Sequence, residues 1–512
     1  MVAKVHFFFI FATFFKFVLE DMVQLPVDFS EYMRDLLGED EYKLFFEALQ
    51  SESPVSIRVN PLKWKKKLAA SSCEPVPWAE DGYYLSERPA FTFDPLFHAG
   101  CYYVQEASSM FVQRVLKQYV PTACTMLDLC AAPGGKSTLA RAVLPEGSLL
   151  VSNEIIRTRA QVLAENMVKW GHPDVVVTQN APVDFTPLTN VFDVILADVP
   201  CSGEGMFRKD ADSIGEWSKE NVGICWQRQR SIVSDVWGCL KPGGLFIYST
   251  CTYNAWEDEE NIRWMMQHLG AEPLVVPVEK EWGICGDVTS GESVPVYRFL
   301  PSHVKGEGFF LAALRKPMVN DDEAERAFCL ESVGNTLDSD KKKQKSSRTK
   351  GKDMKGKSQK VSFPSYESCR MWLDNPDAYV WKVADTVVVA LPQKWSGIVD
   401  LLEKHLTILH AGISVASLKG RDWVPHHALA MSPSLHPLAF PVVNVDYETS
   451  VSYLRHEAVV LDNSSPRGYL LLVYQGVPLG FVKNVGNRAN NLYPAEWRIR
   501  SGHLPEKVPN VL

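Results

Sequence analysis

The first hundred residues combine two hydrophobic patterns. Residues 29–49, FSEYMRDLLGEDEYKLFFEAL, place apolar side chains three or four positions apart, which predicts amphipathic helices. Residues 56–64, SIRVNPLKW, alternate apolar and polar side chains, which predicts a strand with basic residues exposed on it. We therefore expect a small N-terminal α/β domain over residues 22–95.

From Thr125 onward, short apolar runs alternate with helical segments. Alternation of this kind is typical of a doubly wound parallel sheet, which binds ligands beyond the carboxyl ends of its strands. It predicts an α/β, Rossmann-like domain over residues 96–318. The predicted strands are TMLDLC, LLVSN, VVVTQN, FDVILADV and LFIYST, and the predicted helices are KSTLARAVL, IRTRAQVLAENMVKWG and IVSDVWGCL.

The last part of the chain has a third pattern. Residues 362–512 hold strand-like runs such as YVWKVADTVVVAL and YLLLVYQGVPLGFVK, separated by Gly, Pro and Asn turns. This predicts a mostly β region of one or two small units. Residues 338–360 are nearly free of apolar side chains, so they cannot offset their ordering entropy by burial. We expect a basic, disordered linker over residues 319–361.

The charge of the chain is unevenly distributed. Residues 341–360 contain ten Lys or Arg and one Asp, a net charge of +9, so the rest of the chain carries −17 of the total of −8. The basic segment is either a solvated spacer or an electrostatic tether attracted to phosphates. An average charge of −8 therefore does not exclude a nucleic-acid partner.

Residues 1–21 include the Phe-rich run VHFFFIFATFFKFV. The run is too short to span a bilayer, is interrupted by Lys16 and lacks a small-residue cleavage site. We expect translation to begin at Met22, with an uncleaved anchor as the alternative, and we expect no membrane partner.

The cysteines favour a reducing compartment. Eleven are present, without a CxxC pair and without a His/Cys cluster at zinc spacing. This composition predicts reduced thiols, no metal site and a cytoplasmic protein.

The first candidate site is DLCAAPGGKS, residues 128–137, where a predicted strand runs through a glycine turn into a helix. The first turn of such a helix offers free N–H donors to an anion or a carboxylate. The run differs from a phosphate-binding P-loop only at Cys130, so a nucleotide hydrolase is one interpretation. Glu154, at the end of the next strand, suits ribose hydroxyls and favours an adenosine-type cofactor with little phosphate.

The second and third candidate sites each contain a cysteine at the end of a predicted strand. Cys201 lies in DVPCSGEG, residues 198–205, and Cys251 lies in STCT, residues 249–252. Parallel strands can bring both cysteines to one crevice, and a thiolate is a strong nucleophile. We therefore expect Cys201 and Cys251 to carry chemistry.

Three motifs, in this order, give the chain its family resemblance: AAPGGK, DVPCSGEG and YSTCT. With them, residues 22–512 resemble RNA cytosine-5 methyltransferases of the Nol/Nop/Sun type, and among these the bacterial small-subunit ribosomal RNA enzymes of the RsmF kind. The runs HAGCYYVQEASS (98–109) and VGNRANNLYPAEWRIR (485–500) are also similar to that subgroup.

The resemblance implies a Rossmann-like methyltransferase core, a PUA-like RNA-binding C-terminal region and the cofactor S-adenosylmethionine. Where the family usually has an aspartate near the adenine, this chain has Ala181, so either Asn180 or Asp184 takes that place or cofactor binding is weaker. The implied cofactor-binding residues are Cys130, Ala131, Ala132, Pro133, Gly134, Gly135, Lys136, Glu154, Asn180 and Asp198.

The resemblance also implies catalytic roles. Cys251 is the nucleophile that adds to carbon 6 of cytosine, and Cys201 assists the elimination that frees the product. Asp198 hydrogen-bonds the N3/N4 edge of the base, where charge develops. Lys136 orients Asp198 or the surroundings of the cofactor, or alternatively caps local carbonyls.

The implied partner is RNA, namely 16S ribosomal RNA or the small ribosomal subunit, bound by a monomeric enzyme. The target base would be unpaired or flipped out of its helix. Two alternatives remain at this point, a P-loop nucleotide hydrolase and a catalytically silent RNA-binding assembly factor. The candidate RNA contacts are Arg58, Asn60, Arg208 and Lys209.

Overall fold

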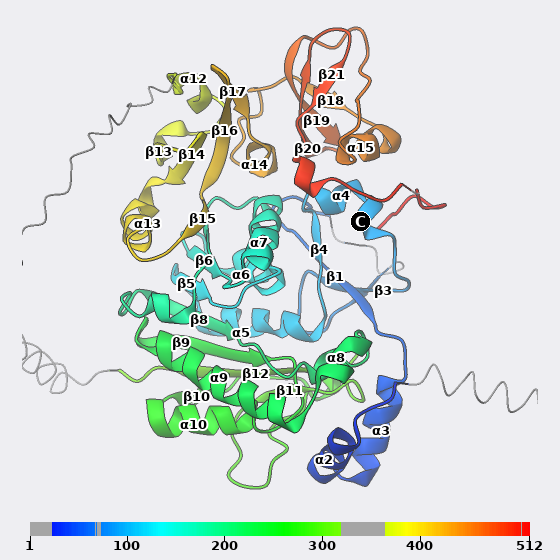
Figure 1. The fold of residues 1–512 in the computed structure, drawn as a ribbon, viewed down its shortest axis with the longest axis vertical. Helices are drawn as coiled ribbons and strands as arrows, with labels where there is room; N and C mark the ends of the chain where they lie inside the picture. The colour runs from blue at the N-terminus through cyan, green and yellow to red at the C-terminus, as the bar shows by residue number, and fades with distance from the viewer. Residues whose placement is uncertain (1–22, 67, 69–72, 319–363, 503) are drawn as a thin grey trace, which may run out of the picture.

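A computed structural model describes residues 23–66, 68, 73–318, 364–502 and 504–512 (Figure 1). The expectations for the start at residues 1–21 and for the basic linker at 319–361 lie outside these ranges. In the described part of the chain, no helix is long and apolar enough to cross a membrane. The same ranges hold no group of three His, Cys, Asp or Glu side chains suited to a metal ion.

The N-terminal region contains a helix pair and a small sheet that pack in different places. The helix pair packs through Phe29 and Phe45 against Phe207 and Tyr253, on loops of the central domain. The sheet has the strand order β2-β3-β1-β4. The elements are α2 (Val27–Leu37), α3 (Glu39–Leu49), β1 (Val55–Val59), β2 (Cys73–Pro75), β3 (Gly82–Leu85), α4 (Pro95–His98) and β4 (Tyr102–Val104).

The N-terminal sheet extends beyond the predicted 22–95 segment. β4 pairs antiparallel with β1, with Tyr102 opposite Val59 and Val104 opposite Ile57. The strand-like run that begins at Tyr102 therefore completes the small sheet before the chain enters the central domain.

The central sheet confirms the predicted doubly wound α/β fold. Its order is β10-β12-β9-β8-β5-β6-β7-β15, with β11 paired to β12. Strands β5 to β9 are parallel, whereas β12 and β10 extend one edge in the antiparallel sense. The strands are β5 (Thr125–Asp128), β6 (Leu149–Asn153), β7 (Val175–Thr178), β8 (Phe192–Asp198), β9 (Leu240–Thr250), β10 (Glu272–Leu274), β11 (Tyr297–Phe299), β12 (Phe309–Arg315) and β15 (Ile408–Ala411).

Helices cover both faces of this sheet, which explains the continuous apolar runs of its parallel strands. Apolar residues of α5, α6 and α7 form a core with one face, and those of α9 and α10 form a core with the other. The helices of the domain are α5 (Val112–Tyr119), α6 (Gly135–Val143), α7 (Arg157–Trp170), α8 (Ala211–Glu216), α9 (Lys219–Trp237) and α10 (Glu259–Leu269).

The C-terminal region is mostly β, as predicted, and forms two four-stranded sheets of order β13-β14-β16-β17 and β18-β19-β20-β21. We call residues 364–431 the middle unit and residues 440–499 the terminal unit. The elements are α12 (Glu367–Arg370), β13 (Tyr379–Ala384), β14 (Val387–Pro392), α13 (Ser396–Leu402), β16 (Ile413–Lys419), β17 (Asp422–Pro425), α14 (His427–Met431), β18 (Val442–Asn444), α15 (Tyr447–Leu454), β19 (Gly468–Tyr474), β20 (Val477–Asn484) and β21 (Ala489–Asn491).

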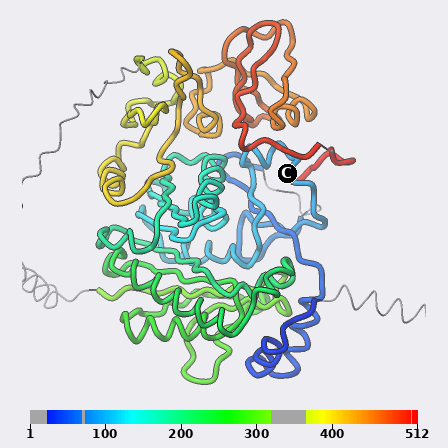
Figure 2. Tube along the Cα trace, in the orientation of Figure 1, coloured from blue at the N-terminus to red at the C-terminus, as the bar shows by residue number. Residues whose placement is uncertain are grey.

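One strand of the middle unit belongs to the central sheet. β15 lies between α13 and β16 in the chain, yet it pairs antiparallel with β7 at the edge of the central sheet. Figures 1 and 2 show this segment crossing from the C-terminal region to the central domain. Sequence periodicity did not predict this pairing, because a four-residue strand carries no sign of its partner.

Candidate active site

The glycine turn of residues 130–136 joins the carboxyl end of β5 to the start of α6. Gly134 has a φ of +116°, a conformation that side chains with a Cβ rarely adopt, and it lets the chain turn into the helix at Gly135. Arg159 and Asn166 of α7 donate hydrogen bonds to the carbonyls of Ala132 and Pro133. The turn is therefore held from its outer side, at the predicted end of the parallel sheet.

Glu154 follows β6 and lies beside this turn, with 3% of its surface exposed. One carboxylate oxygen accepts a hydrogen bond from the Ile156 N–H at 2.9 Å, and the other lies 3.3 Å from Nη1 of Arg159. Each carboxylate oxygen has two lone pairs, so the group retains acceptor capacity for a hydroxyl donor.

Asp184 and Asn180, the two residues that could replace the acidic residue expected after β7, have different hydrogen-bond partners. Oδ2 of Asp184 accepts the Ala181 N–H at 2.9 Å and so closes a local turn. Asn180 is 8% exposed, and its side chain hydrogen-bonds the main chain of Thr407, the residue that directly precedes β15. The side chains of both candidates therefore already have protein partners.

Asp198 and Lys136 form an ion pair where β8 ends. Nζ of Lys136 lies 2.9 Å from Oδ2 of Asp198, while Oδ1 of Asp198 accepts a hydrogen bond from Oγ of Ser249 at 2.7 Å. Burial lowers the pKa of Lys136, but the Asp198 carboxylate outweighs it, so the net pKa is raised and the ammonium stays charged. Of the two alternatives for Lys136, the ion pair favours contact with Asp198 over the capping of carbonyls.

Cys201 and Cys251 meet at this same edge of the sheet. Their sulfur atoms are 3.2 Å apart, and both residues are partly exposed. The hydrogen bond to the Cys251 sulfur, together with burial, raises the pKa of the Cys201 thiol well above its ordinary value. Cys201 therefore keeps its proton at neutral pH and can donate it toward Cys251.

A buried polar network that the sequence analysis did not identify joins the two cysteine loops. Oγ of Ser202 and Oγ1 of Thr252 are 2.9 Å apart, Thr252 donates to Glu204 at 2.6 Å, and Asn254 donates to Glu257 at 2.7 Å. Burial, with Glu204 nearby, raises the pKa of Glu257 to about 7. The signal in the sequence was the dense polar composition after each cysteine, SGEG and TYN.

Three of the four candidate RNA contacts are wrong, because their side chains are internal. Arg58 is 1% exposed and bonds Gln105 and Thr138, and Asn60 is fully buried and bonds the carbonyls of Gly100 and Trp170. Arg208 is buried against Glu307. The alternation of apolar and polar residues in residues 56–64 predicted that Arg58 is exposed, but both faces of β1 are covered. Lys209 is partly exposed and remains a candidate.

Asp128, at the end of β5, is a buried carboxyl group next to the glycine turn, and its pKa is raised. Its Oδ2 accepts a hydrogen bond from Ser137 at 2.6 Å, whereas its buried Oδ1 has no partner among the described residues. Burial, partly opposed by the Ser137 hydrogen bond, raises the pKa of Asp128 from 3.8 to about 7.

We expect the Asp128→Asn variant to lose part of the pH dependence of stability. Because the folded chain holds this proton more tightly, the free energy of unfolding falls as pH rises from about 4 to about 7 and then levels off. Calorimetric melting temperatures at pH 5 and pH 8 should therefore differ less in the variant than in the unmodified chain. Equal differences would show that the Asp128 proton is not linked to folding.

Three family models match parts of this chain. Family models for "16S rRNA methyltransferase RsmB/F", for the N-terminal domain of 16S rRNA methyltransferase RsmF and for the RsmF PUA domain match residues 120–315, 25–107 and 440–499. Together they follow the central domain, the N-terminal region and the terminal unit.

Individual relatives extend over most of the chain. Ribosomal RNA small subunit methyltransferase F of Erwinia tasmaniensis is 27% identical, with 94% of this chain and 98% of the relative covered. The protein of the same name from Pectobacterium atrosepticum is 34% identical over 57% of this chain and 63% of the relative. The crystal structure of PH0851 aligns with a TM-score of 0.50 and 25% identity, covering 57% of this chain and 66% of that one.

Proposed function

Since the chain belongs to the RsmB/F family of 16S rRNA methyltransferases, we propose that it methylates carbon 5 of a cytosine through a covalent bond to Cys251. That it is an S-adenosylmethionine-dependent rRNA methyltransferase follows from the family; the atom that is methylated and the roles of the cysteines are the proposal. The observation that carries it is the 3.2 Å approach of the Cys201 and Cys251 sulfurs beside the Lys136–Asp198 ion pair.

The residues around the glycine turn fit the cofactor. S-adenosylmethionine supplies a methyl group on a positively charged sulfur, ready for attack by a nucleophile. Glu154 is buried beside the turn and keeps acceptor capacity for ribose hydroxyls. This favours an adenosine-type cofactor with little phosphate over the P-loop alternative.

Each part of the site then has a task in holding the cofactor. Main-chain N–H groups at the start of α6, around Gly135, would hold the carboxylate of the cofactor. Glu154 would accept hydrogen bonds from the ribose hydroxyls, and Asp198 would border both the cofactor and the base. These assignments are proposals from position and chemistry.

Carbon 5 of cytosine is a poor nucleophile, and a thiolate overcomes this. The Cys251 sulfur adds to carbon 6, forming a C–S bond and moving the electron pair of the 5,6 double bond toward carbon 5. Carbon 5 would then take the methyl group as the S–CH3 bond of the sulfonium breaks and its sulfur leaves as a neutral thioether. Solvent water takes the proton from carbon 5, whose electron pair re-forms the double bond as the C–S bond breaks and Cys251 leaves as a thiolate.

Cys201 acts in the last step. Because its pKa is high, its thiol is protonated in the resting site and, from 3.2 Å away, can donate a hydrogen bond to the Cys251 sulfur. A thiol hydrogen bond to the departing sulfur stabilises the thiolate that forms when the C–S bond breaks. Removing this donor should leave attack possible and slow the release of the enzyme.

Asp198 and Lys136 act on the base. The side chain of Asp198 is 29% exposed, enough to reach a ligand while Oδ2 contacts Lys136. A carboxylate at the N3/N4 edge accepts hydrogen bonds from the N4 amino group and from a protonated N3. It thereby favours the protonated N3 that takes up the electron density added as carbon 6 is attacked. The Lys136 ammonium fixes the orientation of the carboxylate, in a site where preorganised charges have large effects.

Mapping of 5-methylcytosine tests the function. Bisulfite sequencing of 16S rRNA from a strain that lacks the gene should reveal an unmodified cytosine that becomes protected when the intact gene is restored. The Cys251→Ala gene serves as the matched control and should not restore protection. A deletion strain with an unchanged bisulfite pattern, or restoration by Cys251→Ala, would contradict the proposal and favour the silent assembly factor.

A further inference from the structure

The interface between the middle unit and the central domain, which we call the seam, runs along β7. In the pairing of β15 with β7, Ile408 is opposite Thr178 and Ala411 is opposite Val176. The ladder continues at both ends, because Gln179 N–H donates to the Thr407 carbonyl at 3.0 Å and Gly412 N–H donates to the Val175 carbonyl at 3.1 Å. The middle unit thus closes an edge of the cofactor-binding sheet.

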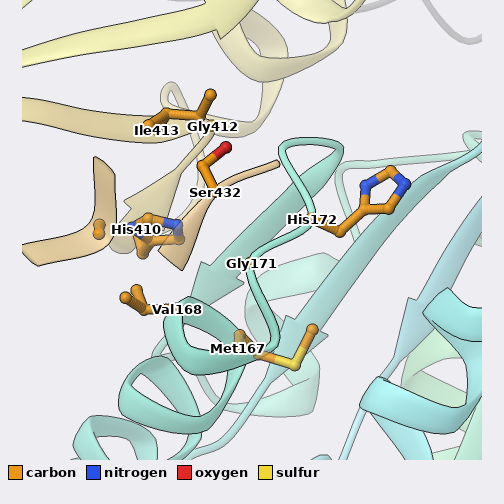
Figure 3. Close-up of a pocket in the computed structure, with 9 residues that line it drawn as sticks. Met167, Val168, Gly171, His172, His410, Gly412, Ile413 and Ser432 are labelled. Atoms are coloured by element: carbon orange, nitrogen blue, oxygen red, sulfur yellow. The ribbon is translucent and has the colours of Figure 1, made fainter. Parts of the chain in front are cut away.

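The other side of the seam is equally close. Figure 3 shows Val168 and Gly171, at the end of α7, close to His410, Gly412 and Ile413 of the middle unit and to Ser432, which directly follows it. Gly171 has a φ of +90°, and a Cβ placed on it would lie 2.1 Å from the Met431 carbonyl oxygen. The main chains of the two parts are therefore in direct contact at this point, where only glycine fits.

At the end of the seam nearest the proposed cofactor site, the side-chain amide of Asn180 makes two hydrogen bonds to the main chain of Thr407. Oδ1 of Asn180 accepts the Thr407 N–H at 3.0 Å, and Nδ2 donates to the Thr407 carbonyl at 3.3 Å. The Thr407 side chain is exposed, so the contact depends on its main chain.

Asn153 continues this contact to the glycine turn. Its Oδ1 accepts the Asn180 N–H at 3.0 Å, and its Nδ2 donates to the carbonyls of Asn180 and Leu129, both at 3.0 Å. Its own carbonyl accepts the Ala131 N–H at 2.8 Å. Asn153 is 1% exposed. We call Asn153, Asn180 and Thr407 the asparagine bridge, since it connects the carboxyl ends of β5, β6 and β7 to the middle unit.

The terminal unit is packed firmly on the same middle unit. The two share one apolar core, to which α7 of the central domain also contributes. Its members include Val168, Val415, Met431, Phe440, Leu471 and Phe481. A constraint on the terminal unit is therefore transmitted by close-packed side chains to the segment that holds β15.

We propose that Thr407 is a positioning residue of the cofactor site and that the asparagine bridge couples cofactor binding to RNA binding by the C-terminal region. The inference rests on the proposed cofactor site at Cys130–Lys136 and Glu154, but not on which atom of the RNA is methylated. The bonds of this bridge join the ends of β5, β6 and β7, where the glycine turn and Glu154 lie, so ordering one site restricts the other. Such coupling is reciprocal: each ligand tightens the other by the same factor.

The test measures this factor without methyl transfer. Titration calorimetry gives the affinity for S-adenosylhomocysteine with and without transcribed 16S rRNA, and filter binding gives the RNA affinity with and without S-adenosylhomocysteine. For the full-length chain we expect the two factors to agree and to be about fivefold or more, the lower end of measured couplings.

The decisive variant is Asn180→Asp. It keeps an acceptor for the Thr407 N–H but places a carboxylate oxygen against the Thr407 carbonyl, where the amide donated a hydrogen bond. We expect the coupling factor to fall to about one, with a weaker affinity for S-adenosylhomocysteine. Thr407→Ala is the matched control, since it removes an exposed side chain and keeps the main chain, and it should retain the full factor.

A coupling factor near one in the unmodified chain, or one that survives in Asn180→Asp, would overturn the inference. Melting temperatures compare the folded state of the variants, because a purely structural role would lower stability while leaving the factor unchanged. If the proposed chemistry is wrong, the cysteine variants will not form the expected covalent complexes with RNA. The coupling factors measured by binding will not change in that case.

Discussion

Cys201→Ala is expected to accumulate as a covalent complex with its RNA, whereas Cys251→Ala forms none. The reason is their different place in the proposed reaction, in which Cys251 makes the C–S bond and Cys201, whose sulfur lies 3.2 Å away, assists its cleavage. With S-adenosylmethionine and 16S rRNA, Cys201→Ala should methylate once and then remain attached. Denaturing electrophoresis of labelled RNA detects the complex.

The double variant provides the control for this experiment. Cys201→Ala/Cys251→Ala should form no complex, since nothing adds to carbon 6. A complex in Cys251→Ala alone would exchange the two roles. If neither single variant forms a complex and both keep full activity, thiol catalysis is refuted and the reaction proceeds by another route.

Asp198→Asn is expected to lower the methylation rate by about 10²–10³-fold, the usual effect of removing one preorganised electrostatic group. The amide keeps an oxygen for Ser249 but loses the negative charge that faces Lys136 and the base. The rate is measured in a single turnover with labelled methyl donor, so that product release does not limit it.

Ser249→Ala separates the charge of Asp198 from its orientation. This variant removes only the 2.7 Å hydrogen bond to Oδ1, so a loss of roughly two- to tenfold is expected, the value of one hydrogen bond. Asp198 would not be the group that stabilises the base if Asp198→Asn reacted as fast as Ser249→Ala.

Local patterns in the sequence predicted the central domain well. The runs after Thr125 are buried on both faces, and such strands are uniformly apolar whatever their order in the sheet. The residues that end these strands, Asp128, Glu154, Asp198 and Cys251, lie together because parallel strands end at a common edge. Their proximity follows from topology, and the polar character of each strand end was visible in the sequence.

Contacts between distant segments were not predictable in this way. Arg58 is a typical surface residue by type, but its guanidinium bonds Thr138, 80 positions later, and it stacks on Trp170. A charged side chain carries no sign of its burial when its partners come from another domain. The pairing of β15 with β7 was hidden for the same reason.

This pairing also bears on a chain that ends after Pro317. If the predicted α/β domain of residues 96–318 were sufficient by itself, such a chain would keep cofactor binding. Removal of β15 would, however, expose the edge of β7 and take away the partner of Asn180. We therefore expect such a chain to bind the cofactor more weakly than the full-length chain, because residues 407–412 complete the edge of the sheet.

The same strand determines the order of events during synthesis on the ribosome. Strands β5 to β9 can assemble as soon as they emerge, but their edge at β7 stays unpaired until residues 408–411 are also made, over 150 residues after Thr250. An unpaired edge strand is a site where another nascent chain can add. Slow translation of the intervening segment would prolong this exposure, so a chaperone that shields the β7 edge of the unfinished chain should raise the yield of folded enzyme.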